Sequence, residues 1–346
     1  MKILHVLSTG GYSGAENVVI TLINSMKEIS ECAYTSPNGD IATILSENGI
    51  KYYPMKTSLI NIIELKKIIT ECKPDIIHAH DFLASAVAAL VSGRIPIISH
   101  LHNNPLWVKK ICTWTIVYFC LSKKYKRIFS VSDAVIDEFV FGKYLQGKTR
   151  IVGNPIDVNA IRRKADAAKI VEKSDIIFLG RLTKQKDPIF FLEIIRDLVK
   201  MIPSVKVAIV GDGELRDNVM EKYKEFSLED NIKMYGFVRN PYGLLKSSKI
   251  LCMPSQWEGF GLAAIEALVF GLPVLAAPVG GLANIITSEC GKLCTSREEY
   301  VSEMKKLLFD QLYYENKSRN AKIRAKSYDN IVEYTRKVMS EYNKVI

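Results

Sequence analysis

The sequence lacks several short patterns that would assign a chemistry directly. Its 346 residues contain no D-x-D carboxylate pair of the kind that holds a divalent metal beside a phosphate. The seven cysteines are scattered through apolar runs, with neither zinc-ligand nor redox-pair spacing. These absences argue against a metal centre, a thiol redox site and a disulfide-stabilised secreted domain, and they indicate a reducing compartment.

Two glycine-rich stretches also fall short of nucleotide-binding fingerprints. Neither 9–16 nor 211–216 completes G-x-G-x-x-G, because Arg216 occupies the third glycine position of the second stretch. Dehydrogenase chemistry therefore loses its main sequence support. The segment 142–149, G-K-Y-L-Q-G-K-T, matches the phosphate-loop pattern, but a helical stretch precedes it and a strand follows. Because that motif requires the opposite order, we interpret the match as coincidence in a connecting loop.

Charge and length narrow the class of protein. The chain has 47 basic and 37 acidic residues, and its net charge of +10 favours an anionic partner such as a phosphorylated ligand or an acidic membrane surface. None of the common nucleic-acid-binding patterns occurs, so we expect no nucleic-acid partner. The length and the 48% hydrophobic content fit two α/β domains. Residues 1–7 are too short for a signal peptide, so we expect a cytoplasmic protein.

Apolar strand-like runs alternate with helix-length segments, which is typical of parallel sheets covered by helices on both faces. We expect strands at 2–8, 41–45, 75–80, 96–102, 127–132 and 150–153, and a second series at 175–180, 205–210, 232–235, 249–253 and 273–276. The charged segment 160–174 is the expected linker. The pattern predicts two Rossmann-like domains, 1–160 and 161–327, facing each other across a cleft with ligands at the carboxyl ends of the strands.

The stretch 254–281 is the most informative part of the chain. An apolar run at 250–253 predicts a strand, and 263–270 predicts a helix stopped by Gly271. Glu258 then lies in the loop after the strand and Glu266 inside the helix, on the order of 10 Å apart. That separation is too long for a retaining glycosidase pair, but it suits a ligand with a long polar body.

The loop between the two glutamates favours an anion. The backbone N–H groups of Gly259, Phe260 and Gly261 open the helix, where amides and the helix dipole attract a phosphate. One carboxylate could accept hydroxyl protons from a sugar and the other from a ribose, which together describe a nucleotide-sugar. The alternative is an ordinary helix of a doubly wound domain, with one solvated and one capping glutamate.

The segment 258–274, E-G-F-G-L-A-A-I-E-A-L-V-F-G-L-P-V, resembles the E-x7-E element of the retaining glycosyltransferases of family 4, which have the GT-B fold. Such enzymes take part in bacterial capsule, exopolysaccharide and lipopolysaccharide synthesis. A glycine loop ending in G-A-E, a histidine strand and a G-R-L…K element at 180–186 precede it in the order that the family has. In this fold the last helix commonly crosses back to the first domain, which we expect of 328–346.

The resemblance implies roles for individual residues. Arg181 and Lys186 would clamp the donor diphosphate and stabilise the charge of the leaving group without a metal ion or other cofactor. Glu266 would bind the ribose and Glu258 the sugar hydroxyls. The implied catalytic residues are His102, Arg181, Lys186 and Glu258. The implied donor-binding residues are Gly11, Gly180, Arg181, Lys186, Gly211, Phe237, Val238, Glu258, Gly259, Phe260, Gly261, Leu262 and Glu266. The implied acceptor-side residues are Gly14, Glu16, His80 and His102.

Histidines end two of the expected strands. His78 and His80 are two residues apart and so point to the same side of a strand. Such a pair could hold a metal, but no third ligand is in sequence reach, so we expect His80 to be a polar residue facing the cleft and His78 to be packed. The resemblance gives His102 the place of the family's active-site histidine, in contact with the donor sugar or the reaction centre. Asn103 follows it where many members have glycine, and a two-residue shift would select His100 instead.

The segment 104–127 has basic ends around an apolar, tryptophan-containing middle and no acidic residue. This composition suits a helix lying in a membrane interface, and the apolar part is too short to span a bilayer. The alternative is a buried core helix with a solvated basic end.

The whole pattern predicts a retaining, metal-independent glycosyltransferase that moves a hexose from a UDP- or GDP-sugar to an acceptor hydroxyl. The preferred acceptor is a lipid-linked glycan, which would place the enzyme at the inner face of the plasma membrane. Two alternatives are a nucleotide-sugar 2-epimerase, which needs no acceptor, and a non-catalytic subunit of a polysaccharide-assembly complex.

Overall fold

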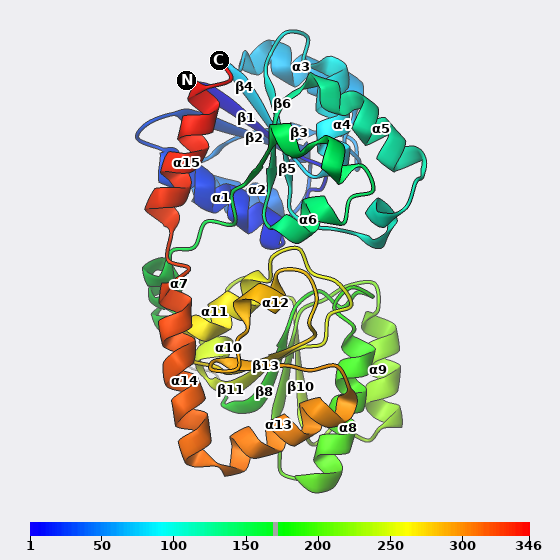
Figure 1. Ribbon diagram of the computed structural model, residues 1–346, viewed down its shortest axis with the longest axis vertical. Coiled ribbons are helices and arrows are strands. Elements are labelled where there is room, and N and C mark those ends of the chain that lie inside the picture. Colours follow the sequence, from blue (N-terminus) through cyan, green and yellow to red (C-terminus); the bar gives the residue numbers. More distant parts are fainter. Residues whose placement is uncertain (169–171) are drawn as a thin grey trace. The chain divides into compact units, whose positions relative to one another are not determined.

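The computed structural model describes residues 1–168 and 172–346 (Figure 1). Its internal contacts divide the chain into two compact units, one formed by Met1–Pro155 together with Asn330–Ile346 and the other by Ile156–Asp329. Each unit is built on one parallel sheet with helices packed on it. The predicted class of two Rossmann-like parallel-sheet domains is therefore confirmed.

The first unit contains a seven-stranded sheet with the order β3-β2-β1-β4-β5-β6-β7. Its strands are β1 Lys2–Leu7, β2 Glu31–Pro37, β3 Lys51–Met55, β4 Ile76–His80, β5 Ile97–Leu101, β6 Tyr125–Ser130 and β7 Thr149–Ile151. Its helices are α1 Gly14–Met26, α2 Ile41–Glu47, α3 Ile62–Cys72, α4 Phe82–Val91, α5 Thr113–Leu121, α6 Asp133–Asp137 and α15 Ile331–Asn343, with short 3-10 turns such as η1 Leu106–Lys109. The strand order reverses between β1 and β4, the point at which ligands bind in open α/β sheets.

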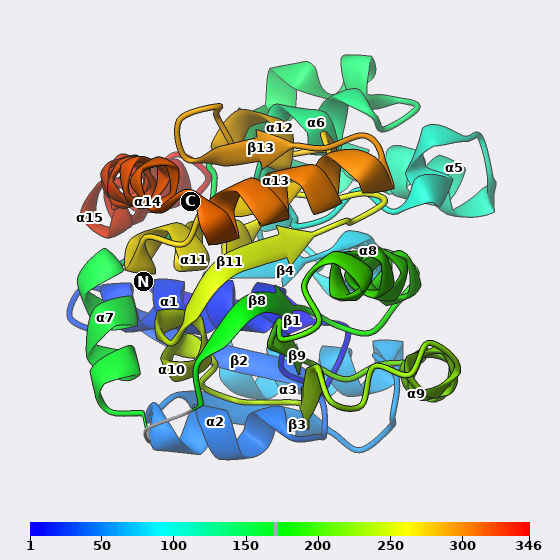
Figure 2. The same cartoon turned by 90° about the horizontal axis from the view of Figure 1, so that it is seen from below.

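The second unit contains a six-stranded sheet with the order β10-β9-β8-β11-β12-β13, which is seen obliquely in Figure 2. Its strands are β8 Ser174–Leu179, β9 Val207–Val210, β10 Ile232–Gly236, β11 Ser248–Met253, β12 Val274–Ala276 and β13 Gly291–Leu293. Its helices are α7 Val158–Asp166, α8 Pro188–Met201, α9 Arg216–Glu225, α10 Tyr242–Lys246, α11 Leu262–Phe270, α12 Leu282–Ile285, α13 Arg297–Phe309 and α14 Gln311–Lys326. Here the order reverses between β8 and β11, so this sheet also has a switch point.

One expected strand is wrong. Residues 41–45 begin helix α2, in which Ile41, Ile44 and Leu45 are the buried side chains. Positions i, i+3 and i+4 form one face of a helix, so these residues bury a single stripe. The strands β2, β3 and β13 were not among those expected. The predicted linker 160–174 includes most of α7, and its residues 169–171 lie outside the described part of the chain.

The last helix, α15, packs on the sheet of the first unit. Tyr334, Val338 and Tyr342 are buried in one cluster with apolar residues of β1, β4, β5 and β6. Burying each such side chain contributes roughly 1.5–3 kcal/mol. Polar contacts add to this anchor, because Glu341 of α15 accepts a 2.7 Å hydrogen bond from Arg127 of β6.

Candidate active site

The loop after β8 brings two of the predicted cations to the carboxyl end of the second sheet. A Cβ placed on Gly180 would lie 3.4–3.5 Å from three carbons of the Lys186 side chain, so the lysine stem lies against the glycine. The Lys186 ammonium forms an ion pair with the Glu258 carboxylate. Their side chains are only 16% and 11% exposed, so this pair is largely withdrawn from water.

A second set of contacts joins the loop after β8 to the loop after β11. The Gln185 side chain donates to the carbonyl of Trp257 at 3.1 Å, and the Gln185 carbonyl accepts from the amide of Gln256 at 2.8 Å. Arg181 is exposed and donates to the Gln185 side chain at 3.4 Å. The predicted residues Arg181, Lys186 and Glu258 are thereby brought together, and Gln185 is a residue that the sequence did not single out.

Helix α11 opens toward the same place. Its N-cap is Gly261, which has a φ of +103° and no side chain to bind the first-turn amides, and the first turn contains no acidic residue. A helix start of this kind offers free N–H groups and the positive end of the dipole to an anion. Leu262 starts the helix and is half-buried, as is Phe260, whereas Gly259 is buried.

Three glycines allow the backbone of this region to pack closely. A Cβ on Gly280 would lie 1.6 Å from the carbonyl oxygen of Glu258, and one on Gly281 would lie 2.1 Å from that of Phe260. Gly211, at the end of β9, has a φ of +142°, and a Cβ there would lie 1.9 Å from the Gly180 carbonyl oxygen. Any larger residue at these positions would displace the loop that carries Glu258 or the loop that carries Lys186.

Glu266 lies one turn into α11 and differs in environment from Glu258. The Tyr242 hydroxyl donates to its carboxylate at 2.9 Å. Burial raises the pKa of Glu266, and the Tyr242 hydrogen bond and the charges of Lys164 and Lys186 partly offset the increase. The two glutamates of the E-x7-E element are therefore held by different partners, one by an ammonium and the other by a hydroxyl.

The ends of β9 and β10 complete this side of the sheet. The Gly211 amide donates to the Gly236 carbonyl at 2.7 Å, which ties the two strand ends together. Phe237 follows directly and is 57% exposed, while Val238 packs partly against the core. An exposed aromatic ring at a strand end is available for stacking on a planar ligand.

In the first unit the glycine loop is held by Glu16. Its carboxylate accepts from the Thr9 hydroxyl at 3.0 Å and from the backbone and hydroxyl of Ser13 at 2.9 and 2.5 Å, which caps α1. Glu16 is only 5% exposed, so its contacts in this structure are those of a loop-holding residue. Gly11 and Gly14 are exposed, and a Cβ on Gly11 would meet no described atom within 4 Å.

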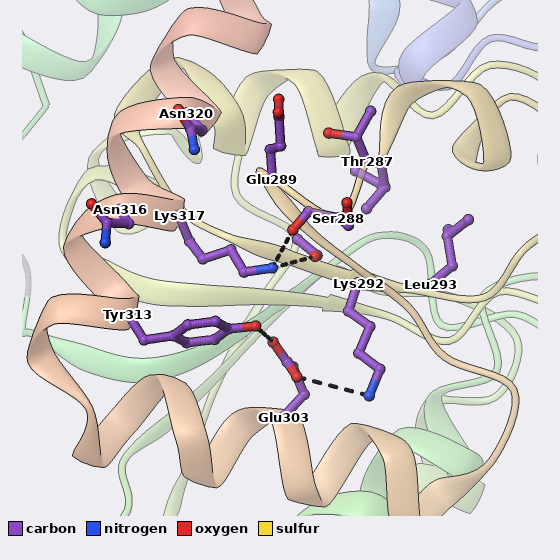
Figure 3. Close-up of a pocket in the computed structure, with 12 residues that line it drawn as sticks. Thr287, Ser288, Glu289, Lys292, Leu293, Glu303, Tyr313, Asn316, Lys317 and Asn320 are labelled. Atoms are coloured by element: carbon purple, nitrogen blue, oxygen red, sulfur yellow. Dashed lines mark hydrogen bonds and ion pairs between the residues drawn. The ribbon is translucent and has the colours of Figure 1, made fainter.

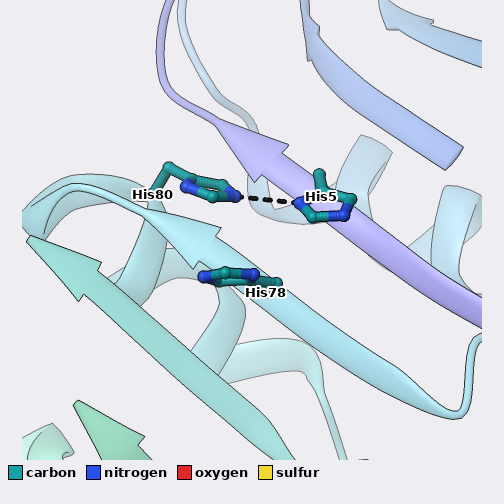
Figure 4. A group of neighbouring side chains, drawn as sticks. All are labelled: His5, His78 and His80. Carbon is teal, nitrogen blue, oxygen red and sulfur yellow. Dashed lines mark hydrogen bonds between the residues drawn. The ribbon is translucent and has the colours of Figure 1, made fainter. Parts of the chain in front are cut away.

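The predicted histidines lie together in the first unit, in two hydrogen-bonded rows that stack on each other. His80 is 1% exposed and lies between His5 of β1 and His102, with N···N distances of 3.0 and 2.9 Å. Figure 4 shows the contact between His80 and His5. The ring of His80 is thus enclosed by its neighbours, and its role on the acceptor side stays a prediction. His78 is fully buried, as predicted. His102 is the only half-buried member, and burial lowers its pKa to about 3.

Sequence reasoning missed His5 and Tyr342. The Tyr342 hydroxyl lies 2.6 Å from Nδ1 of His78, and the other ring nitrogen of His78 lies 3.1 Å from His100. His5 lies within the expected strand 2–8, so its place in the sheet could be predicted. Its contact with His80 could not, because nothing in the sequence indicates that β1 lies next to β4.

The second unit also has a hollow of about 650 Å³ between α14 and the β12–β13 region, lined by none of the predicted site residues (Figure 3). The polar groups in its wall form hydrogen bonds with one another. Lys317 donates to the carbonyls of Ser288 and Gly291 at 2.5 and 3.0 Å, and the Tyr313 hydroxyl donates to Glu303 at 2.6 Å. These contacts hold α14 against the sheet, and we do not place the active site here.

Two family models match the chain over adjoining ranges. Residues 12–160 match Glycosyltransferase Family 4, and residues 160–327 match Glycosyl transferases group 1. The chain belongs to glycosyltransferase family 4. It is therefore an enzyme of the glycosyltransferase class, and the resemblance carried by 258–274 is confirmed.

Relatives and solved structures agree with this assignment. A Campylobacter jejuni α-1,4-N-acetyl-D-galactosaminyltransferase, named for an undecaprenol-diphosphate-linked acceptor, is 25% identical over 95% of both chains. An uncharacterized Methanocaldococcus jannaschii glycosyltransferase is 28% identical over 62% of this chain, which spans about three fifths (58%) of that relative. The crystal structure of HepE from Anabaena with UDP-glucose, 20% identical, superposes with a TM-score of 0.86 over 99% of this chain and 100% of that one, which confirms the GT-B fold.

Proposed function

We propose that this enzyme transfers a hexose from a nucleoside-diphosphate sugar, UDP- or GDP-linked, to a hydroxyl of a lipid-linked glycan, with retention of the anomeric configuration and without a metal ion. The observation that carries the proposal is the convergence, in the second unit, of an uncapped helix start, two cations and two carboxylates. Supporting it, the HepE structure holds UDP-glucose, and the C. jejuni relative is named for a lipid-diphosphate-linked acceptor.

The donor would lie along the carboxyl ends of β8, β9, β10 and β11. The α11 amides and the Arg181 and Lys186 side chains would bind the diphosphate, Glu266 the ribose hydroxyls and Glu258 the sugar hydroxyls. The backbone around Phe237 and Val238 would meet the base. All of the proposed donor residues except Gly11 belong to the second unit.

The chemistry would depend on the two cations. The bond from the anomeric carbon to the diphosphate oxygen breaks while the acceptor oxygen bonds to the same carbon, and the acceptor proton passes to the departing phosphate. The negative charge on the leaving group grows in this step, so fixed positive charges at Arg181 and Lys186 stabilise the transition state more than the bound donor. In this proposal His102 contacts the sugar or the reaction centre and is not the general base.

A calorimetric and thermal-shift screen with UDP, GDP, ADP and their sugars tests the donor site. We expect one base to be preferred, and expect Arg181→Ala and Glu266→Ala to weaken binding by roughly tenfold or more, since each removes a charged hydrogen-bond partner. Lys249→Ala is the matched control, because Lys249 is an exposed cation at the amino end of β11, paired with Asp175. Folded protein that binds none of these nucleotides would refute the donor proposal and favour a non-catalytic subunit.

A membrane surface is the second part of the proposal. In the segment 104–127, Ile111, Trp114 and Ile116 are 69%, 61% and 45% exposed, whereas Val108 and Tyr118 are buried, so the segment packs on the core and also exposes large apolar side chains. The exposed cations around them are Lys109, Lys110, Lys123, Lys124 and Lys126. Exposed apolar side chains with cations before and after them in the sequence suit the interface of a bilayer with anionic lipids. No helix in residues 1–168 and 172–346 is long and apolar enough to cross a membrane.

Sedimentation with vesicles tests this surface. Binding to phosphatidylglycerol-containing vesicles, with little binding to phosphatidylcholine alone, is the expected result, and Trp114→Ser with Ile111→Ser should reduce it several-fold. Phe309→Ser is the control, because Phe309 is 68% exposed in the second unit. Equal loss in the control, or binding indifferent to lipid charge, would exclude this segment as the membrane contact.

A further inference from the structure

All five histidines of the chain lie together in the first unit, on β1, β4 and β5 and at the residue just after β5. They form two rows. His5, His80 and His102 are joined edge to edge at 3.0 and 2.9 Å, and His78 and His100 are joined at 3.1 Å (Figure 4 shows His5, His78 and His80). The rows stack on each other, with ring centroids of His78 and His80, and of His100 and His102, both 4.1 Å apart.

Hydrogen bonds among these imidazoles cannot pair all of their ring nitrogens. A neutral imidazole has one N–H donor and one acceptor nitrogen, so each row can run in either direction. In both directions Nε2 of His5 ends the first row and Nε2 of His100 ends the second, and each is buried without a hydrogen-bond partner among the described residues. A buried unpaired polar group costs free energy, which makes this cluster unusual as a purely structural core.

The cluster has the composition of a transition-metal site. Two sets of three histidines each offer ring nitrogens that all lie within 4.8 Å of one another: His5, His78 and His80, and His80, His100 and His102. An ion held at 2.0–2.1 Å by tetrahedral ligands needs nitrogens about 3.4 Å apart, which small ring movements would reach. Imidazole ligands favour Zn²⁺, Co²⁺, Ni²⁺ and Cu²⁺ over Mg²⁺ or Ca²⁺.

The second set is the one that an ion can reach. The three rings of the first set are 0–1% exposed, whereas His102 is half-buried. The second set also has outer partners in place. Nε2 of His80 faces Nδ1 of His5, and Nδ1 of His100 faces Nε2 of His78, so His80 and His100 can each donate a second N–H while the other nitrogen binds the ion.

We propose that His80, His100 and His102 form a binding site for one zinc-class ion, with the fourth position open to water. The planes of the His100 and His102 rings are 28° apart in this structure. Because the lone pair of a ring nitrogen lies in the plane of its ring, two stacked rings cannot both point at one ion. The His102 ring must therefore rotate to complete the site. Binding of the ion replaces the His80–His102 hydrogen bond with one metal–nitrogen bond to each of these two residues, and the third bond is to the unpaired Nε2 of His100. The transfer reaction proposed above needs no metal ion, and the binding of the ion can be measured without substrate.

Titration of the full chain with Co²⁺, followed by visible absorption, tests the site. The protein is freed of any polyhistidine tag and treated with a chelator before use. We expect one Co²⁺ per chain with the intense bands of a four-coordinate ion, at a Kd of about 10 µM or tighter, displaced by Zn²⁺ and not by Mg²⁺. His102→Gln should abolish the bands, whereas His5→Gln, which removes only an outer partner, should weaken binding by about tenfold and keep them.

Cys112→Ser is the matched control, because Cys112 is a half-buried thiol in the same unit and should not be a ligand. Circular dichroism of each variant shows that it remains folded. Absence of the bands in wild type, their survival in His102→Gln, or their loss in Cys112→Ser would overturn the proposal. Loss in His5→Gln with retention in His102→Gln would also overturn it, since the ion would then occupy the first set.

Discussion

The ion pair between Lys186 and Glu258 gives a quantitative test of the site. Lys186→Met keeps the apolar stem that lies against Gly180 and removes only the ammonium. The Glu258 carboxylate, on a side chain that is 11% exposed, is then left without its cation. Breaking a fully buried pair costs about 3–5 kcal/mol, and the residual exposure of both partners places this one near the lower end, at about 3 kcal/mol.

The second unit contains a convenient probe for this measurement. Trp257 is the only one of the chain's three tryptophans in that unit, and it precedes Glu258. In a Trp107→Phe, Trp114→Phe background, its fluorescence follows urea unfolding of the second unit. With a slope of about 2 kcal/mol per molar urea, a loss of about 3 kcal/mol lowers the midpoint by about 1.5 M.

The double variant separates an unpaired charge from lost packing. Lys186→Met with Glu258→Gln removes both charges, so we expect it to be more stable than Lys186→Met alone, with a coupling of about 2 kcal/mol. A cost below about 1 kcal/mol for Lys186→Met, or strict additivity of the two single changes, would show that the pair is solvated and would refute the buried-pair reasoning.

Three further predictions follow from other contacts. Glu16→Ala removes the acceptor of three hydrogen bonds and should destabilise the first unit by about 1–2 kcal/mol and speed amide exchange at Ser13, whereas unchanged exchange would contradict the capping role. Gly211→Ala should cost at least about 3 kcal/mol and lower nucleotide affinity, because its Cβ would overlap a backbone oxygen; Gly147→Ala, with open space, is the neutral control. Burial lowers the pKa of His5 to about 3, so the unfolded state binds more protons between about pH 3 and 6.5, and stability falls as pH is lowered. From pH 7 to 5, with chelator present, we expect His5 to lower the free energy of unfolding by about 2 kcal/mol. Asp81 partly opposes this loss, because burial raises its pKa to about 6. A His5→Gln variant whose stability falls as steeply with pH as that of wild type would disprove this.

Much of the second unit could be predicted because its signals are local. Strand 250–253, the loop with Glu258 and the helix ending before Gly271 follow from apolar runs and stop signals that lie within about twenty residues. The structure has β11, the loop and α11 in that order, with Gly271 at a φ of +83°. The order of elements around 142–149 is also a local signal that excludes a phosphate loop, and the structure has 3-10 turns there followed by β7.

The parts that failed depend on contacts between distant segments. The run 41–45 is apolar enough for a strand, and only its packing as a stripe against β1–β3 makes it a helix. No local pattern joins His5 to His80, because 75 positions separate them and β1 meets β4 only through the order of strands in the sheet. Likewise, no third histidine lies near His78 and His80 in the sequence, but the fold brings His5 next to them in space.

The different partners of the two glutamates lead to a final prediction about the donor. A bare nucleoside diphosphate would draw Lys186 toward its phosphates and leave the Glu258 carboxylate without a cation, whereas a nucleotide-sugar would also give Glu258 hydroxyl donors. Wild type should therefore bind the nucleotide-sugar roughly tenfold more tightly than the bare nucleoside diphosphate, since a hydrogen bond to a buried charge is worth about 1.5–3 kcal/mol. In Glu258→Gln the unpaired charge no longer exists, so the bare diphosphate should bind more tightly and the advantage of the sugar should shrink. Calorimetry with the preferred nucleotide and its sugar measures both ratios, and an advantage that is unchanged in Glu258→Gln would show that the carboxylate does not contact the sugar.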